Sequence, residues 1–199
     1  MNRQLAEILL SKIDAPYIDR KAGMVQAFEK AYEVDNGNGQ STSTIKKIPM
    51  AFVGNKLVEF IPNSKYRCMV YFEDYGISSP TSNSRGWYYE SRIRLVCWMN
   101  TILFSGVQDP AVVAKVMNDI VSRLSGINPF NQSPYTMIQT KVINIPIQDK
   151  NIFSRYTYTE ADLQYLMAPY DFFALDLRVS FTIPRGCLPT ITTTAPPTC

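Results

Sequence analysis

The most regular pattern in the chain is an alternation of apolar and polar residues close to its C-terminal end. Apolar side chains occupy every second position, at Phe173, Leu175, Leu177, Val179, Phe181 and Ile183, and the positions between them include Asp176, Arg178, Ser180 and Thr182. Because successive side chains of a strand point to opposite faces of a sheet, this run predicts a half-buried antiparallel strand. Pro169, Tyr170 and Asp171 predict the turn that leads into it.

Two other stretches have the spacing of amphipathic helices. Near the N-terminus, the apolar residues that fall on one helical face are Leu5, Ile8, Leu9 and Ile13. A second helix is predicted between Asp109, which can cap its first turn, and Gly126, which can close its last, with Pro110 in the first turn. Its apolar stripe consists of Val113, Val116, Met117, Ile120, Val121 and Leu124. We expect the first helix to dock on the protein and the second to lie flat on a sheet.

Shorter apolar runs predict the remaining strands. These runs are Pro49 to Val53, Leu57 to Ile61, Cys68 to Phe72, Trp87 to about Phe104, and Met137 to Ile147. The last of them is expected at an edge or bulged, because Pro146 interrupts it. Residues 20–34 fit either a helix or a strand, and we favour the strand. In the long strand that begins at Trp87, one face is apolar, whereas the other is mixed and carries Arg92, Arg94, Val96 and Trp98.

Polar stretches between these runs predict loops and set the fold class. Residues 35–44 and 73–86 form two long polar loops, and residues 151–168 are irregular with a short helix from Glu160 to Met167. We predict an α+β fold, in which a mostly antiparallel twisted sheet is packed by the N-terminal helix and the central helix. This single domain spans residues 1–187, and residues 188–199 form a flexible Thr/Pro-rich tail.

Charge narrows the classes of partner only a little. The chain has 20 Lys and Arg against 17 Asp and Glu, a net charge of +3, which is too small to indicate nucleic-acid binding without a concentrated patch. The nearest such patch comprises Lys65, Arg67, Arg85, Arg92 and Arg94. For these residues we favour a solvated or ion-paired face over contact with a polyanion. The 10 Phe, 12 Tyr and 2 Trp suit half-buried sheets and protein interfaces, while core packing alone explains any single ring equally well.

Candidate chemistry is sparse, because the chain contains no histidine. This excludes Ser-His-Asp and Cys-His catalysis and histidine-ligated zinc. The closest acidic pairs are Glu73 with Asp74, and Glu160 with Asp162. Adjacent strand residues face opposite sides of a sheet, and acids at a helix start favour the helix dipole, so neither pair is a good catalytic candidate. We therefore expect no enzyme activity and no cofactor or metal.

The four cysteines lack any CxxC pair, and Cys68 and Cys97 lie inside apolar runs. Nothing at the N-terminus resembles a secretory leader, so we expect reduced thiols in a cytoplasmic setting. No apolar run approaches the length of about 20 residues that a bilayer requires, and we expect no membrane partner.

The order of elements resembles the tail terminator and neck proteins of tailed bacteriophages, in the divergent form found in phages and prophages of Bacteroidetes. The resemblance rests on IPMAFV, on DPAVVAKVMNDIVSRL and on IFSRYTYTEADLQYLMAPYDFFALDLRVSF, and it covers about residues 1–187. It implies a structural virion protein that forms a ring, typically of six subunits, between head connector and tail tube. Such a ring terminates the tube, joins tail to head, and lets genome DNA pass without specific binding. It implies assembly in the host cytoplasm and a final location in the neck of the virion.

Candidate contact residues lie on the mixed face of the long strand and in the first polar loop. Tyr88, Arg92, Arg94 and Trp98 lie on the mixed face of the long strand, and Asn36 and Asn38 lie in the loop at residues 35–44. We expect exposed faces or edges of the sheet to pair between subunits, with the loops reaching towards connector or tube. Alternatives are another neck or connector ring, a baseplate or adhesin-type binding subunit, and a histidine-free enzyme.

Overall fold

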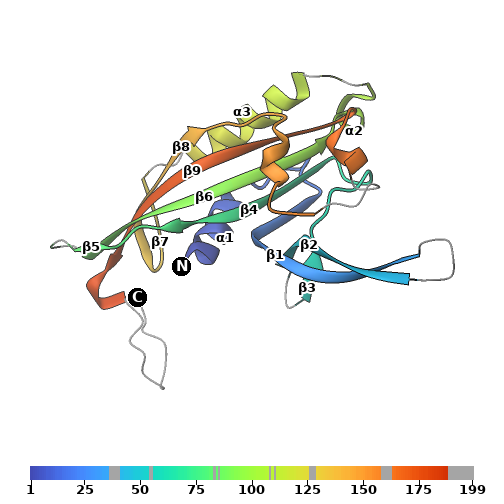
Figure 1. The fold of residues 1–199 in the computed structure, drawn as a ribbon. Helices are drawn as coiled ribbons and strands as arrows, with labels where there is room; N and C mark the ends of the chain where they lie inside the picture. Colours follow the sequence, from blue (N-terminus) through green and yellow to red (C-terminus); the bar gives the residue numbers. More distant parts are fainter. Residues whose placement is uncertain are drawn as a thin grey trace.

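A mostly antiparallel sheet of nine strands forms the frame of the protein in the computed structural model (Figure 1). The structure describes residues 1–35, 41–53, 56–82, 84, 86–107, 109, 111–125, 129–157 and 163–187. Along the sheet the strands follow the order β3-β2-β1-β4-β6-β9-β8-β7, with β5 paired to β6. The β1–β4 pair is parallel, and the other strand pairs of this order are antiparallel. The predicted α+β class is therefore confirmed.

The elements and their bounds, in chain order, are as follows. The N-terminal half contains α1 Asn2–Lys12, β1 Arg20–Asp35, β2 Ser41–Val53, β3 Lys56–Glu59, β4 Cys68–Ile77, β5 Thr81–Ser82 and β6 Gly86–Asn100. The C-terminal half contains α2 Thr101–Ser105, α3 Ala111–Ser125, β7 Phe130–Gln132, β8 Tyr135–Asn144 and β9 Tyr170–Pro184, with single-turn 3₁₀ helices η1 Lys150–Phe153, η2 Gln164–Leu166 and η3 Arg185–Cys187.

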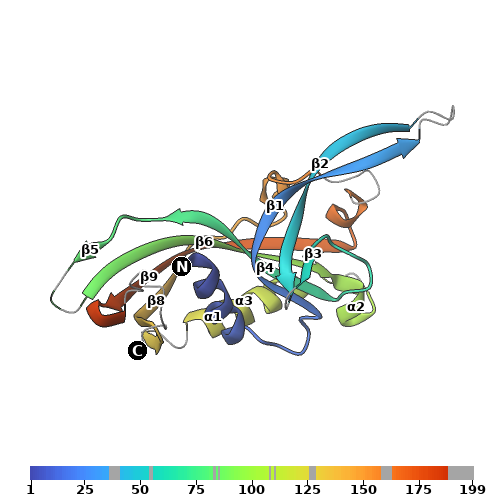
Figure 2. The same ribbon diagram turned by 90° about the horizontal axis from the view of Figure 1, so that it is seen from below.

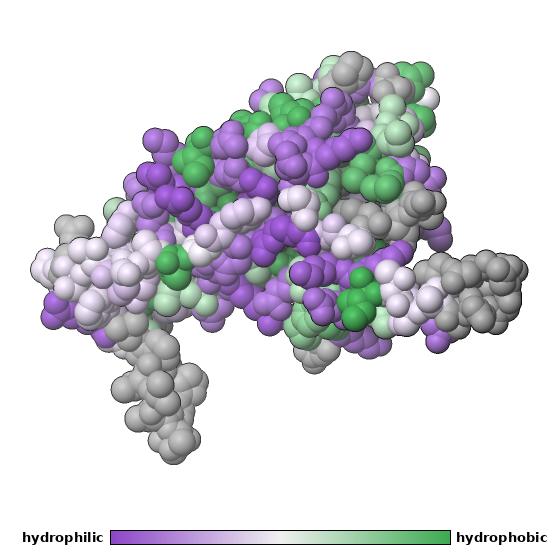
Figure 3. Space-filling model, in the orientation of Figure 1, coloured by the Kyte–Doolittle hydropathy of each residue, from purple (hydrophilic) through white to green (hydrophobic). Residues whose placement is uncertain are grey.

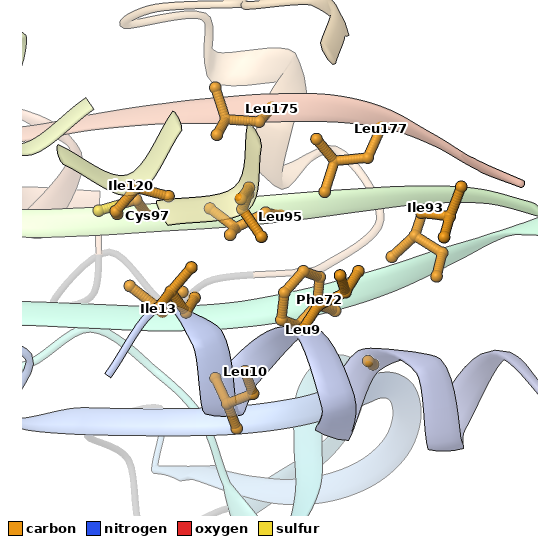
Figure 4. Packing of buried hydrophobic residues seen from close by; sticks show 14 of the residues in the cluster. Leu9, Leu10, Ile13, Phe72, Ile93, Leu95, Cys97, Ile120, Leu175 and Leu177 are labelled. Carbon is orange, nitrogen blue, oxygen red and sulfur yellow. The ribbon is translucent and has the colours of Figure 1, made fainter. Parts of the chain in front are cut away.

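Helices α1 and α3 cover one face of the sheet, called here the inner face (Figure 2). All six apolar side chains of the β9 alternation point into this core and are at most 3% exposed. Figure 4 shows how Leu9 of α1 and Ile120 of α3 meet Leu95 and its neighbours on the sheet. Full burial of one such side chain stabilises the fold by roughly 1.5–3 kcal/mol. The apolar stripes predicted for both helices are confirmed.

The predicted cap of α3 is confirmed as well. The carboxylate of Asp109 accepts the N–H of Ala111 at 2.8 Å, and its carbonyl accepts the N–H of Val112 at 3.1 Å. These bonds satisfy two of the backbone donors that a helix start leaves without an intrahelical partner. Pro110 and Gly126, to which the sequence assigns the first turn and the end of this helix, lie outside the described residues.

The opposite face of the sheet, called here the outer face, is covered over one half only. Over that half, η1, η2 and the roots of β1 and β2 enclose a second apolar cluster. Its members are Ala22, Val25, Ala51, Phe60, Met69, Tyr71, Val96, Trp98, Ile152, Phe153, Tyr156, Phe172 and Ala174. Over the other half, Arg92 and Tyr88 of β6 are exposed to solvent. The sheet is thus a three-layer structure at one end and a two-layer structure at the other.

Strands β1 and β2 leave the main sheet together as a two-stranded ribbon, called here the arm. Strand β1 pairs with β4 only as far as Val25, whereas its residues 26–35 pair with residues 41–50 of β2. Figures 1 and 2 show the arm projecting from the body, and in Figure 2 it rises on the side of the outer face. Its root is held by the N–H of Thr157, which donates to the carbonyl of Lys47 at 2.7 Å.

Several loop predictions are wrong in their extent. Asp35 ends β1 and residues 41–44 begin β2, so the strands extend into the predicted loop at 35–44 from both ends; residues 36–40 lie outside the described residues. The predicted loop at 73–86 is largely β-structure, because β4 continues to Ile77 and β5 pairs with β6. The long strand ends at Asn100, where α2 begins.

Predictions about the C-terminal part of the chain and about the cysteines are partly confirmed and partly corrected. The short helix expected between Glu160 and Met167 is present as the single turn η2, although residues 158–162 lie outside the described residues. Cys68 and Cys97 are buried free thiols, as expected, with their Sγ atoms 3.5 Å apart. Cys187 is disulfide-bonded, which corrects the expectation of reduced thiols at that position.

Candidate assembly surface

Strand register brings three cations side by side on the open half of the outer face. Arg92 of β6 lies directly opposite Arg178 of β9, and Arg178 lies directly opposite Lys141 of β8. We call these three residues the basic row. Directly opposite side chains on neighbouring strands have Cβ atoms only about 5 Å apart, so like charges there destabilise the sheet. Figure 3 views the molecule from this side and shows hydrophilic side chains gathered over the middle of the sheet.

The basic row is only partly neutralised within the chain. The Nε of Arg178 lies 3.4 Å from a carboxylate oxygen of Glu90. Arg92 and Lys141 have no ion-pair partner among the residues that the structure describes. A hollow of about 370 Å³ runs along this part of the sheet, and Tyr88, Glu90, Gln139, Lys141, Arg178 and Ser180 contribute to its lining. The surface therefore offers positive charge that an external carboxylate or phosphate can reach.

The next row of the same face, in contrast, is paired internally. Arg94 donates from Nε to Asp176 at 2.6 Å, and its guanidinium lies 4.7 Å from the centre of the Tyr75 ring. The hydrogen bond to Asp176 raises the pKa of Arg94. Asn144 of β8 donates to the same carboxylate at 3.1 Å. Arg94 is thus occupied in holding β6, β9 and β8 together.

A buried carboxylate marks the boundary between the covered and the open half. Glu73 of β4 is fully buried and accepts a hydrogen bond from the Tyr156 hydroxyl at 2.6 Å and one from the Tyr75 hydroxyl at 3.3 Å. Arg155 lies 3.8 Å away. Burial raises the pKa of Glu73, and the hydrogen bond from Tyr156 and the charges of Arg155 and Arg94 oppose that shift. This network ties the segment after η1 to the sheet.

Of the six residues predicted to form contacts, the structure places three on the open outer face. Tyr88 is 40% exposed, Arg92 is exposed, and Arg94 is half-buried in its ion pair. Asn36 and Asn38 lie outside the described residues. Tyr88 and Arg92 therefore stay available for contact with a partner, whereas Arg94 is engaged with Asp176.

Trp98 shares the predicted face but lies in the second apolar cluster, where it is 1% exposed. Its Nε1–H donates to the carbonyl of Tyr165 at 2.6 Å, and its ring stacks on Tyr170 with centroids 5.2 Å apart. A side chain that is enclosed in this way anchors the segment around η2 to the sheet. The assignment of Trp98 to a contact surface is therefore corrected, because the chain itself covers that end of the outer face.

The arm presents a second surface, which the sequence interpretation did not single out. Cross-strand pairing places three residues of β1 opposite three of β2 on one side of the ribbon, and all six are exposed: Glu29, Ala31, Glu33, Ser43, Ile45 and Lys47. We call this side the arm face. Ile45 is 67% exposed, and Glu29 approaches Lys47 at 4.0 Å. The alternation of Glu29, Ala31 and Glu33 is a sequence signal that could have revealed it.

No family model matches the chain, and no curated protein matches it. Within the described ranges, no three His, Cys, Asp or Glu side chains lie close enough together to hold a metal ion. None of the helices in the same ranges is long and apolar enough to cross a bilayer.

Proposed function

We propose that this chain is a structural subunit of a tailed-phage virion that assembles head to tail into a ring at the neck. In this role it ends the tail tube and joins the tail to the head connector. The proposal combines the resemblance stated above with the surfaces of the folded chain. It requires two different contact surfaces on each subunit, because a head-to-tail contact joins unlike patches.

The observation that carries the proposal is the arm. A two-stranded ribbon is marginally stable by itself in water, and this one extends beyond the sheet with the six residues of the arm face exposed. Residues 26–35 of β1 pair with β2 along one edge, and among the described strands nothing pairs with their other edge. Unpaired edges and an exposed Ile45 favour association with another chain.

The open half of the outer face supplies the second surface. It is rich in charge and formed by side chains of four strands, and it lies on the body rather than on the arm. A chain with an arm and a separate receiving face can contact two neighbours at once. Such a subunit builds a closed ring when the rotation from one copy to the next divides a full turn.

Electron microscopy of the purified chain, with and without connector and tail-tube proteins of the same phage, tests this function. We expect ring-shaped particles with a central opening that bind to the end of the tube. Particles that never form rings, or rings that bind neither connector nor tube, contradict the proposal. Binding to host-surface glycans in their place would identify an adhesin-type subunit.

A further inference from the structure

We infer that the arm face of one copy lies on the basic row of the next copy. This inference rests on the proposed head-to-tail ring and names the surfaces that would form its interface. The partner is therefore a second copy of this chain, and the contact joins acidic and apolar residues of the arm to basic and apolar residues of the sheet.

Charge is the first reason for this pairing. On the sheet, Arg92 and Lys141 flank Arg178, and neither flanking cation has an ion-pair partner among the described residues. On the arm, Glu33 also lacks an ion-pair partner in the part of the chain that the structure describes, and Glu29 has only the distant contact with Lys47. Each surface thus carries the charge that the other lacks. Bringing them together offsets the repulsion within the basic row.

The spacing of the charges agrees as well. Four residues of a strand span roughly 13 Å, which separates Glu29 from Glu33 along the arm. The basic row crosses two strand intervals, or roughly 10 Å, from Arg92 to Lys141. Because Arg and Lys side chains are long and flexible, they readily cover the remaining difference. An arm that crosses the strands of the sheet therefore sets both carboxylates over the outer cations.

Exposed apolar residues border the charged ones on both surfaces. Ile45 of β2 is opposite Ala31, midway between Glu29 and Glu33, and it is the most exposed large apolar side chain among the described residues. On the sheet, Ile143 is 45% exposed and Tyr88 is 40% exposed, on either side of the basic row along the strands. An apolar side chain between two ion pairs excludes water from them and strengthens both.

The remaining side of the arm is less suited to this contact. There Tyr32 is half-buried, with the ammonium groups of Lys30 and Lys46 at 5.2 Å and 5.4 Å from its ring centre. Lys30 is also paired with Glu59 at the root of the arm. That side is therefore basic and partly covered, and it would repel the basic row of another copy.

Complementary charge reversals test the inference. The arm variant carries Glu29→Lys and Glu33→Lys, and the row variant carries Arg92→Glu and Lys141→Glu. All four side chains are exposed, so circular dichroism and thermal unfolding should report a native fold for both variants. A matched control, Lys56→Glu with Lys115→Glu, reverses two exposed charges that belong to neither surface.

Sedimentation velocity gives the expected results. Each variant alone should remain monomeric at concentrations at which the wild-type chain and the control assemble, a loss of association of at least 100-fold. An equimolar mixture of the two variants should assemble as the wild-type chain does, with the two variants alternating, because the intact row of the arm variant receives the intact arm of the row variant and the two reversed surfaces also carry opposite charges. The chain with all four substitutions should assemble again, because the charges are exchanged and not removed.

The outcomes separate the inference from the function on which it rests. If the wild-type chain assembles and either variant assembles equally well, the inference is overturned and the ring stays as proposed. The same holds if the mixture of the two variants does not assemble and the four-substitution chain does not assemble either. If the wild-type chain itself never associates, both the ring and this interface are contradicted.

Discussion

Arg92 and Arg178 lie directly opposite each other on the neighbouring strands β6 and β9, on the face of the sheet that α1 and α3 leave open. Two guanidinium groups in this relation repel each other, and Lys141 extends the repulsion to β8. A sheet gains nothing from such a row in an isolated subunit. In the proposed interface a second copy brings carboxylates to this row, and the proposal has consequences that can be measured.

Removing one of the two arginines should stabilise the isolated subunit. We expect Arg92→Thr to raise the free energy of unfolding by about 0.2–1 kcal/mol, because it relieves a like-charge cross-strand pair. Urea unfolding at low protein concentration measures this. The gain should shrink at high salt, since exposed charges are screened, and Arg92→Lys should show none of it. A loss of stability in Arg92→Thr would mean that the repulsion is already neutralised within the chain.

Trp98 should behave as a core residue and Tyr88 as a surface residue, although both point to the same side of β6. Trp98→Ala removes a ring that is 1% exposed and should cost about 3–5 kcal/mol of unfolding free energy. Tyr88→Ala should change stability by no more than about 0.5 kcal/mol. Equilibrium urea unfolding of both variants makes the comparison. Equal effects of the two substitutions would contradict the burial of Trp98 beneath the segments that cover this end of the outer face.

Glu73 should make stability depend on pH in an unusual direction for a carboxylate. Burial raises its pKa above the ordinary 4.5, so the folded chain keeps the proton to a higher pH than the unfolded chain does. Its contribution to stability is therefore complete below the unfolded pKa and is lost as the pH rises through the folded pKa. In urea unfolding from about pH 4 to about pH 7, Glu73→Gln should lose less stability than the wild type as the pH rises.

A matched control for this effect is Glu29→Gln, which alters an exposed glutamate on the arm. Its unfolding free energy should follow the wild-type pH dependence. If Glu73→Gln also follows the wild-type curve, the carboxyl is as well solvated or as well paired in the folded chain as in the unfolded one.

Two isoleucines of β2, three residues apart, should separate association from folding. Ile45 is 67% exposed on the arm face, whereas Ile48 is 3% exposed at the root of the arm. Ile45→Ser should leave stability within about 0.5 kcal/mol and weaken self-association. Ile48→Ala should cost about 2–5 kcal/mol of unfolding free energy. If Ile45→Ser instead lowers the free energy of unfolding strongly, Ile45 packs against the sheet of its own chain.

The sequence predicted those elements that bury a continuous apolar stripe. Strand β9 and helix α3 have such stripes, and the structure contains both where the pattern placed them. The strand favoured for residues 20–34 is confirmed by β1, but the first part of its partner β2 was missed for the same reason. Residues 41–44 of β2 read Ser-Thr-Ser-Thr and contain no apolar residue, so hydrophobic periodicity cannot distinguish them from a loop. Their strand character depends on pairing with β1, which the sequence alone does not reveal.

The residues that lie on the outer face were predicted in part. Alternation correctly put Arg92, Arg94 and Trp98 on one side of β6, but it could not tell where the cover of that side ends. That boundary depends on η1 and η2, which are far away in the sequence and have weak patterns of their own. The basic row could not be predicted from the sequence either, because Lys141 and Arg178 lie beside Arg92 only through the register of three strands.

The central claim, that the chain assembles through its arm into a closed ring, is tested most directly by sedimentation velocity of the wild-type chain over a wide range of concentrations. The account predicts one discrete species several times heavier than the monomer, six times for a hexamer, with no larger species as the concentration rises. A chain that sediments as a monomer at every concentration, or that grows into particles without a limit, would contradict it.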